Sequence, residues 1–286
     1  MENVLMNRTV LMSDPDHYSV VELNTYSHKE VQPNREKAKH EHALVARALQ
    51  DAGIVIRQER SPVGCQDGVY VANWAFCSGD TAVMSRLPGP RQGEQVYSAG
   101  LLSRYKSDII IPPYRFSGQG DALACGDMLF VGGGYRSDPR MADVLRRIFR
   151  YKYKVKSVQT VPMLKDGRPV TNRLSGWPDS EFYDIDLAMG ILKPDMIAWC
   201  PEAFMPESQD LINDLEGIKK IEVSRSEATQ AFACNLVSTG ETVIMGTGAP
   251  KFEAALARAG LGVVTVPIPE LQKGGGSARC MTLNLG

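Results

Sequence analysis

The sequence predicts an α/β protein built as a closed array of similar supersecondary units. Helix, strand and hairpin alternate about five times, at roughly 50 to 60 residues a unit, and such a repeat is typical of arrays rather than of an open doubly wound sheet. No linker-like stretch interrupts this order, so we expect residues 1–286 to form a single domain. Residues 131–136, Val-Gly-Gly-Gly-Tyr-Arg, follow a predicted strand but lack the G-x-G-x-x-G spacing of a dinucleotide site.

The helices are predicted from caps and apolar periodicity. In the segment 34–53, Asn34 is a suitable N-cap, Gly53 ends the helix, and an apolar stripe runs between them. Ser137 is the expected cap of a second helix with Pro139 in its first turn, and Ser224 with Glu227 forms a capping box. The remaining segments follow the same reasoning, and the full set is 34–53, 93–106, 137–152, 206–217, 224–235 and 250–260.

Strands are predicted where β-branched and aromatic residues lie between turn signals. Three hairpins are expected, turning at residues 77–80, 125–127 and 193–195. The strands are expected at 54–60, 69–76, 81–87, 108–113, 155–164, 182–192, 195–200, 219–224, 241–246, 262–271 and 277–285, with two more in the hairpin 121–134.

Composition excludes several classes of partner. The formal net charge is −1 and the lysines and arginines are scattered, which gives no electrostatic support for a nucleic-acid or anionic-membrane surface. No run approaches the ~18 apolar residues of a membrane span. Residues 1–18 lack the basic and apolar regions of a signal peptide. We therefore expect a cytoplasmic protein with neither a nucleic-acid nor a membrane partner.

The cysteines and histidines give little indication of a disulfide or metal framework. No Cys-x-x-Cys pair occurs, and the wide spacing argues against a disulfide framework. Zinc ligation by His40 and His42 with a distant cysteine is one reading, but the spacing suits it poorly and a solvated helix face is favoured. We predict no metal and no other cofactor. The six cysteines are Cys65, Cys77, Cys125, Cys200, Cys234 and Cys280.

The last cysteine, Cys280, follows three consecutive glycines at 274–276 and lies in an alternating, strand-like tail. One reading is a small apolar residue in a terminal strand. The other is a nucleophile that a flexible, glycine-rich turn presents to a substrate. The local sequence leaves both readings open.

The Gly-Gly-x-x-x-Cys-x-Thr pattern at Cys280 is one of several motifs that share a family order. The motifs cover nearly the whole chain, at residues 11–24, 66–94, 118–138, 182–204, 232–235 and 274–283. Together they resemble the guanidine-modifying enzymes of the amidinotransferase, or pentein, superfamily, above all dimethylarginine dimethylaminohydrolase and arginine dihydrolase-like proteins. The resemblance implies a five-bladed, pseudo-symmetric α/β propeller of ββαβ units around a polar channel. It also implies a role in arginine metabolism.

The chemistry of these enzymes requires a cysteine thiolate that attacks the guanidino carbon and forms a covalent intermediate. By resemblance, Cys280 is that nucleophile. Anions hold the planar guanidinium by bidentate hydrogen bonds, and arginines bind the α-carboxylate of the substrate. Ordinary turn or strand-end hydrogen bonds, or a surface arginine, are the alternatives for these positions. The substrate-binding residues implied by the resemblance are Asn24, Asp67, Asn73, Arg91, Ser117 and Arg136.

The sequence departs from the family at two catalytic positions. The histidine of the family's His-x-Asp pair is replaced by Asp184, with Asp186 at the downstream aspartate, and the family's glutamate is replaced by Ser117. Strand alternation predicts that Asp184 and Asp186 share one face, where mutual repulsion raises one pKa and makes Asp184 a general acid. Alternation also sends Arg279 to the face opposite Cys280, which leaves the thiol without a cation to keep it ionised.

Three functional hypotheses follow. The first is a Cys280-dependent hydrolase, or amidino-group transferase, for a guanidino or arginine-like small molecule. Asp184 would replace the histidine as acid/base, Ser117 stands at the glutamate position, and Asp67, Asn73 and Asp186 would hold the guanidinium. The second is a catalytically altered or inactive relative that binds a cationic amino acid or a protein partner. A third is an isomerase or lyase that uses the thiol and the carboxylates on another small molecule. A homodimer is a further open alternative.

Overall fold

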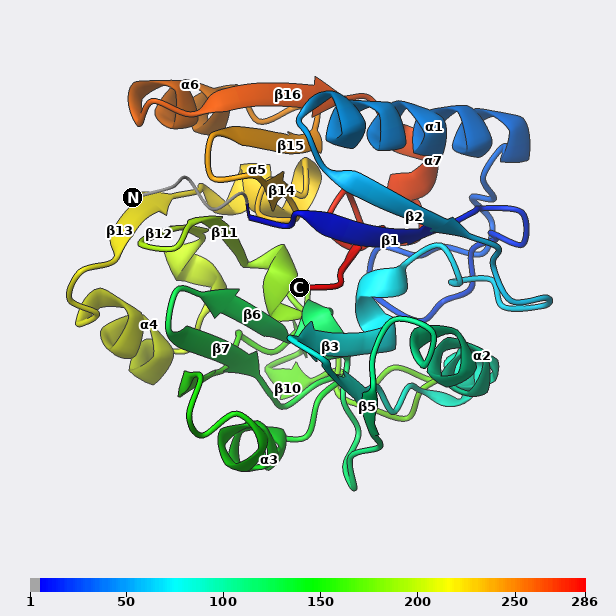
Figure 1. Ribbon diagram of the computed structural model, residues 1–286, viewed down its shortest axis with the longest axis horizontal. Helices are drawn as coiled ribbons and strands as arrows, with labels where there is room; N and C mark the ends of the chain where they lie inside the picture. Colours follow the sequence, from blue (N-terminus) through cyan, green and yellow to red (C-terminus); the bar gives the residue numbers. More distant parts are fainter. Residues whose placement is uncertain (1–5) are drawn as a thin grey trace.

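The computed structural model describes residues 6–286 and consists of short strands and peripheral helices (Figure 1). The strands are β1 Thr9–Ser13, β2 Val55–Glu59, β3 Ala75–Ser78, β4 Thr81–Met84, β5 Asp108–Ile110, β6 Ala122–Cys125, β7 Met128–Gly132, β8 Lys154–Val158, β9 Leu164–Lys165, β10 Arg168–Pro169, β11 Met189–Lys193, β12 Met196–Trp199, β13 Lys219–Glu222, β14 Val237–Ser238, β15 Thr242–Gly246, β16 Gly262–Val266 and β17 Leu283–Asn284. The α-helices are α1 Arg35–Asp51, α2 Gln92–Leu102, α3 Met141–Ile148, α4 Pro206–Asn213, α5 Arg225–Gln230, α6 Pro250–Arg258 and α7 Pro269–Gln272. The predicted α/β class is confirmed.

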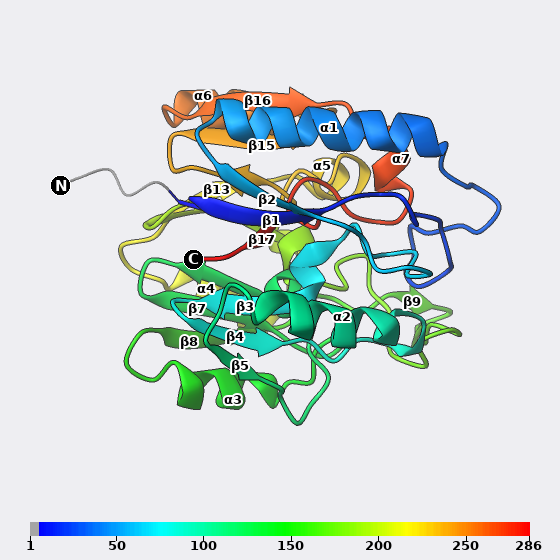
Figure 2. The same ribbon diagram turned by 45° about the vertical axis from the view of Figure 1, so that its right-hand side comes forward.

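One pairing scheme recurs in the sheets. In each three-stranded sheet the middle strand pairs antiparallel with one neighbour and parallel with the other, as in β3–β4–β5 and β6–β7–β8. The same scheme holds for β11–β12–β13 and β14–β15–β16. The sheet β17–β1–β2 repeats it with strands from both ends of the chain, because β1 pairs with β17 (Figure 2).

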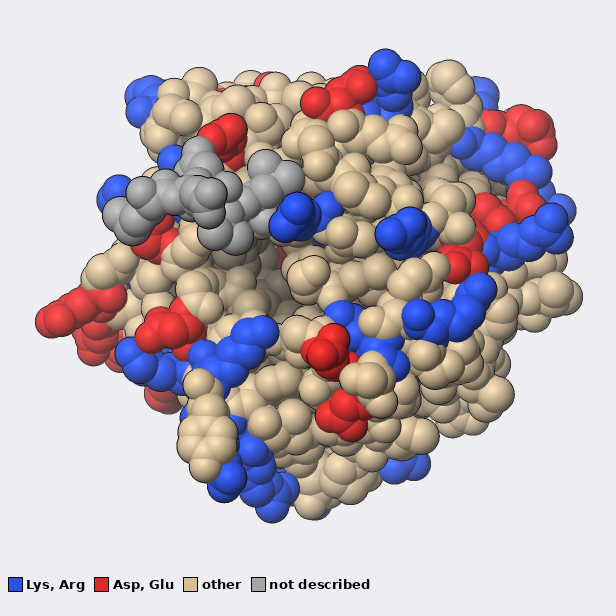
Figure 3. All heavy atoms as spheres, viewed as in Figure 1, with Lys and Arg blue, Asp and Glu red and all other residues tan. Residues whose placement is uncertain are grey.

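A cavity of about 440 Å³ lies where the first strands of these sheets approach one another. Its lining includes Phe76 of β3, Leu123 of β6, Met189 of β11 and Asn284 of β17, together with Leu236 just before β14. On the face of Figure 3, basic and acidic side chains both occur. Within residues 6–286, no helix combines the length and apolar character needed to cross a membrane.

Two predicted caps are confirmed and one is wrong. The side chains of Asn34 and Ser224 accept hydrogen bonds from the first turns of α1 and α5. Ser137 does not cap α3, which begins only at Met141; its hydroxyl instead donates to Asp121. In this case a tertiary hydrogen bond replaces the local capping bond.

Three predicted strands begin late. A 3₁₀-helix at Val71–Trp74 precedes β3, another at Ile185–Leu187 precedes β11, and only Leu283–Asn284 pairs in the C-terminal tail. The backbone amide of Ile185 shows the reason, because it donates to the Asp121 carboxylate rather than to a neighbouring strand. Tertiary hydrogen bonds thus compete with strand pairing at the ends of the inner strands.

The histidines of α1 differ from each other. His40 is exposed, in agreement with the predicted solvated helix face. The same prediction is wrong for His42, which is buried. Burial lowers the pKa of His42 to about 4. No group of three His, Cys, Asp or Glu side chains within residues 6–286 has an arrangement suited to a metal ion.

Candidate active site

Cys280 lies in a turn between α7 and β17, buried to 3% exposure, and not in the predicted strand. The side chain of Asn235 fixes this turn. Its Oδ1 accepts hydrogen bonds from the amides of Ser277 and Cys280 at 2.9 and 3.1 Å, and its Nδ2 donates to Cys280 Sγ at 3.2 Å. The amide of Ala72 donates to the carbonyl of Cys280 at 3.1 Å. Hydrogen bonds therefore fix both the backbone and the sulfur atom of Cys280.

The three glycines before Cys280 are close-packed, which corrects the expected flexible turn. A Cβ on Gly274 would lie 2.2 Å from the Tyr70 hydroxyl, and one on Gly276 would lie 2.8 Å from Cys280 Cβ. Gly275 has a φ of +93° and touches the Asn24 side chain. Glycine is required here for close approach of the backbone and for left-handed geometry.

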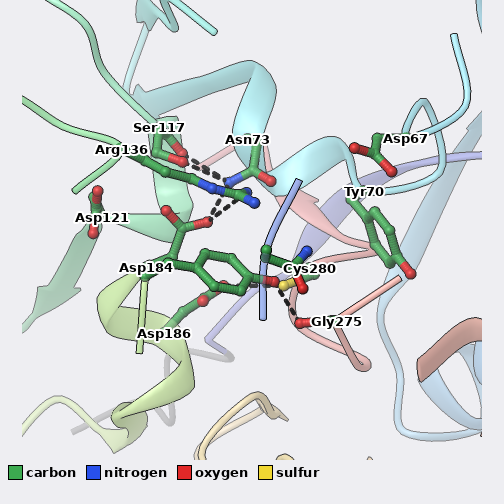
Figure 4. A network of polar contacts seen from close by, with 12 residues as sticks. Asp67, Tyr70, Asn73, Ser117, Asp121, Arg136, Asp184, Asp186, Gly275 and Cys280 are labelled. Carbon is green, nitrogen blue, oxygen red and sulfur yellow. Dashed lines mark hydrogen bonds and ion pairs between the residues drawn. The ribbon is translucent and has the colours of Figure 1, made fainter. Parts of the chain in front are cut away.

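Asp186 is the carboxylate nearest to the thiol. Cys280 Sγ lies 3.5 Å from Asp186 Oδ2, within hydrogen-bonding distance for sulfur, and both residues are buried (Figure 4). Asp184 and Asp186 both lie near Cys280, as predicted, but strand alternation does not place them there. Asp184 is the N-cap of the 3₁₀-helix Ile185–Leu187, and Asp186 lies within that helix.

Two polar contacts hold the carboxylate of Asp184. Its Oδ2 accepts a hydrogen bond from Asn73 Nδ2 at 2.9 Å and lies 3.6 Å from Nη1 of Arg136. The guanidinium of Arg136 lies 3.9 Å above the centre of the Tyr183 ring, whose hydroxyl donates to the carbonyl of Gly275 at 2.5 Å. Asp184 thus has a cation beside it (Figure 4).

The side chain of Asn73 links Asp184 to Ser117 and Arg91. Besides Asp184, its Nδ2 donates to the hydroxyl of Ser117 at 2.9 Å and to the carbonyl of the same residue at 3.1 Å. Its Oδ1 accepts from Arg91 Nη1 at 2.8 Å. Ser117, which replaces the family's glutamate, is therefore a hydrogen-bond partner of the residue that orients Asp184.

Arg91 is bound inside the protein rather than at its surface. It is 1% exposed and makes two hydrogen bonds to Glu94, from Nε at 2.8 Å and from Nη2 at 2.7 Å. Its Nη2 also faces the carbonyls of Asp67 and Tyr70 at 3.3 Å. The surface alternative is wrong for Arg91, and most of its donors are already engaged without a substrate.

Asn24 and Asp67 lie at the edge of the same region. Asn24 Nδ2 donates to the carbonyl of Gly274 at 2.9 Å, while its Oδ1 accepts from the amides of Tyr26 and Ser27. Asp67 Oδ2 is 3.7 Å from Arg91 Nε. Asn24 therefore fixes the glycine turn, and Asp67 lies beside Arg91.

Sequence reasoning missed two residues of this site: Asn235 and Asp121. Asn235 and Asp121 both lie in motifs used for the family resemblance, at 232–235 and 118–138, and the motifs could have found them. Asp121 Oδ1 accepts from the amide of Ile185 at 3.0 Å and Oδ2 from the hydroxyl of Ser137 at 2.6 Å, which positions the Asp184–Asp186 segment. Arg279 was expected on the face away from Cys280; its side chain donates to Gln119 Oε1 and lines the 440 Å³ cavity.

Burial dominates the acid–base properties of the centre. It raises the pKa of Asp186 well above the usual range, with a further rise from Asp184 and an opposing effect from Arg279. It also raises the pKa of the Cys280 thiol, to which Asp186 and Asp184 add. Burial and the charge of Asp184 raise the pKa of Asp121 to about 8. Asp186, Cys280 and Asp121 therefore all favour their protonated forms as long as no additional cation lies beside them.

The Asp67 carboxyl predicts a pH dependence of stability. Burial raises its pKa to about 6, against the effect of Arg91. Because the folded pKa exceeds the unfolded value of about 3.9, this group's contribution is fully present below pH 4 and is lost as the pH rises through 6. We expect the wild type to lose up to about 3 kcal/mol relative to Asp67→Asn between pH 4 and 7, measured by urea unfolding. A difference between the two proteins that stays constant with pH contradicts this expectation.

The chain thus combines five mixed three-stranded sheets of one scheme with a buried thiol beside a carboxyl group, within residues 6–286. No protein-family model matches the chain. N(G),N(G)-dimethylarginine dimethylaminohydrolase of Mycobacterium tuberculosis is 32% identical over 223 residues, which are 78% of this chain and 67% of that protein. The bifunctional arginine dihydrolase/ornithine cyclodeaminase ArgZ of Synechocystis is 28% identical over 284 residues, which are 96% of this chain and 37% of that enzyme.

Solved structures agree with the sequence comparison. The N-terminal domain of ArgZ, an arginine dihydrolase, superposes with a TM-score of 0.85 at 25% identity and covers 97% of each chain. A dimethylarginine dimethylaminohydrolase of Pseudomonas aeruginosa in complex with citrulline shares the fold, with a TM-score of 0.77 at 22% identity over 96% of this chain and 98% of that one. The chain belongs to the family of dimethylarginine dimethylaminohydrolases and arginine dihydrolases in the pentein, or amidinotransferase, superfamily. The resemblance inferred from the motifs is confirmed.

Proposed function

We propose that the chain is a cysteine-dependent hydrolase that cleaves a C–N bond of a guanidino group in an arginine-like small molecule. The carrying observation is the 3.5 Å contact between Cys280 Sγ and Asp186 Oδ2 in a buried, carboxyl-lined centre. The relatives named above, a dimethylaminohydrolase and an arginine dihydrolase, support this substrate class. The scaffold we propose is one catalytic domain whose five three-stranded sheets are the blades of a pseudo-symmetric propeller around the 440 Å³ cavity.

The geometry favours Asp186, and not Asp184 at the histidine position, as the group that exchanges a proton with the thiol. Asp186 contacts the thiol, whereas Asp184 is held by Asn73 and Arg136. We therefore assign proton transfer to Asp186 and guanidinium binding to Asp184. Asp184 Oδ1 is buried without a hydrogen-bond partner within the described chain, so an acceptor remains for an N–H group of a substrate.

The reaction then proceeds in two halves. The proton of Cys280 passes to Asp186 as Sγ attacks the guanidino carbon, and the departing amine takes that proton when its C–N bond breaks. Water next attacks the amidino carbon and gives a proton to Asp186. Breakage of the C–S bond releases a ureido product, and the proton returns to sulfur. A cationic guanidinium beside the pair favours the thiolate, because an opposite charge lowers the pKa of a thiol.

A non-catalytic binding protein is the second candidate, and one observation favours it. The buried Oδ1 atoms of Asp184 and Asp186 both lack hydrogen-bond partners within residues 6–286, so they offer acceptors to any cationic amino acid. Binding alone requires no ionised thiol. The difference between the two functions lies in the fate of Cys280.

Intact-protein mass spectrometry distinguishes these functions. We expect wild-type protein, incubated with arginine, methylarginines, agmatine, citrulline or guanidino acids, to release an amine or ammonia from one of them and to carry a transient mass adduct at Cys280. Cys280→Ala should bind the same compound without an adduct or a product. Thermal stabilisation by a compound in both proteins, with neither product nor adduct in the wild type, would establish the binding protein instead.

A further inference from the structure

The 440 Å³ cavity is separate from the centre around Cys280, because neither Cys280 nor Asp184 nor Asp186 lines it. Two of the side chains that line it are cationic, Arg279 and Lys152, and no acidic side chain of residues 6–286 does so. Cavities of about 300–1,000 Å³ with apolar walls and a few polar groups are typical of small-molecule sites. The apolar wall includes Phe76, Leu123, Met189, Ile191 and Leu236.

Arg279 is a half-buried cation without an anionic partner, whereas Lys152 is exposed. Among residues 6–286, no carboxylate forms an ion pair with Arg279 within 4.0 Å. Its Nη2 donates to Gln119 Oε1 at 2.9 Å, and its Nη1 is covered by protein and has no hydrogen-bond partner in the described part of the chain. A guanidinium stays protonated and is costly to desolvate, so an anion that enters the cavity gains a strong partner.

The contacts of Gln119 let the guanidinium turn toward a ligand at low cost. Gln119 Nε2 donates to the carbonyl of Asn284 at 2.8 Å, and its Oε1 accepts from the amide of Asn284 at 2.9 Å as well as from Arg279. If the side chain of Arg279 turns into the cavity, it gives up one hydrogen bond to a neutral amide. Gln119 then keeps both of its bonds to Asn284, so no polar atom of Gln119 loses its last partner.

We propose that the 440 Å³ cavity is a second ligand site, which binds a small monocarboxylate with an apolar chain. The carboxylate forms a bidentate pair with the guanidinium of Arg279, and the chain packs on the apolar wall. One guanidinium compensates one negative charge, whereas a dianion would leave its second charge uncompensated against apolar side chains. The site does not depend on the proposed hydrolase, because the residues of the Cys280 centre do not line the cavity.

Isothermal titration calorimetry with octanoate and 3-phenylpropionate, each compared with its neutral amide, tests this site. We expect at least one of the two carboxylates to bind the wild type about 10-fold or more tightly than its amide, because a hydrogen bond to a charged group is worth about 1.5–3 kcal/mol. Arg279→Gln should weaken that carboxylate about 10-fold or more and leave the amide nearly unchanged. Arg136→Gln removes the arginine beside Asp184 and should keep the affinity for the carboxylate within about 2-fold of the wild type.

A second variant keeps the test decisive if Arg279→Gln does not fold. Ala124 is a half-buried residue of the cavity wall, so Ala124→Leu narrows the cavity and should weaken the carboxylate and its amide together. Equal affinities of carboxylate and amide for the wild type, or no binding of either carboxylate, overturn the proposal. Unchanged binding in Ala124→Leu, or a loss in Arg136→Gln that Arg279→Gln does not share, places the carboxylate elsewhere and overturns it as well. Turnover of a guanidino compound at Cys280 is measured separately, so the proposed hydrolase and this site stand or fall independently.

Discussion

Replacing Glu94 by alanine is expected to lower the free energy of unfolding by about 3–5 kcal/mol, because it leaves a buried charge without its partner. Glu94 is fully buried and accepts two hydrogen bonds from Arg91 and a third from Trp74 Nε1 at 2.9 Å. In the variant, the nearest carboxylate to Arg91 is Asp67, at 3.7 Å. Urea unfolding followed by circular dichroism measures the loss.

Two controls separate charge from shape at this position. Glu94→Gln keeps the volume and one acceptor, so we expect a loss that is smaller than for alanine but still clear. Asp51→Ala breaks an ion pair with Arg47 whose side chains are 75% and 60% exposed, and it should not shift the midpoint measurably. Equal midpoints for Glu94→Ala and wild type would show that Arg91 finds compensation elsewhere. Since Arg91 also holds Asn73, the alanine variant should lose turnover together with stability.

Replacing Asn235 by alanine is expected to reduce turnover by about 100-fold, the usual cost of misplacing a reacting group by about 1 Å. The change removes the acceptor of two buried amides and the donor to Cys280 Sγ. Each amide left unpaired costs about 1–3 kcal/mol, so stability should fall too. The measurements are steady-state kinetics on the compound identified by mass spectrometry, and urea unfolding.

The matched variant Asn235→Asp keeps the acceptor for the two amides but places a carboxylate beside the sulfur. We expect it to keep more of the wild-type stability than the alanine variant while its thiol becomes harder to ionise, so alkylation and turnover both slow at pH 7. Wild-type turnover in Asn235→Ala would contradict the first expectation, because it would show that the turn of Cys280 keeps its shape without the Asn235 side chain. If Asn235→Asp reacts as fast as wild type, the donor to sulfur has no electrostatic effect.

The sequence was sufficient for the class of fold and for most of its elements. Caps, apolar periodicity and turn residues are local signals, and the segments around α1, α5 and the hairpin β6–β7 follow them. Among the segments that differ, 69–76, 182–188 and 277–282 all carry site residues. In 182–188 and 277–282, backbone amides bond to the distant side chains of Asp121 and Asn235, and in 69–76 the amide of Ala72 bonds to the distant carbonyl of Cys280; no local pattern contains those partners.

The candidate site shows the same limit. Motifs identified Cys280, Asp184 and Asp186, and the structure brings the three together. The motifs could not show that Asp186 contacts the thiol, because that depends on a 3₁₀ turn rather than on strand alternation.

The pairing of β1 with β17 has a consequence for folding kinetics. Val10 and Leu11 pair with Asn284 and Leu283, so this contact closes a loop of nearly the whole chain, a slow and entropically costly event. Cys280 lies three residues before β17. A refolding molecule therefore buries Cys280 in its final surroundings only when β1 and β17 meet, and the loss of Cys280 alkylation during refolding reports that pairing.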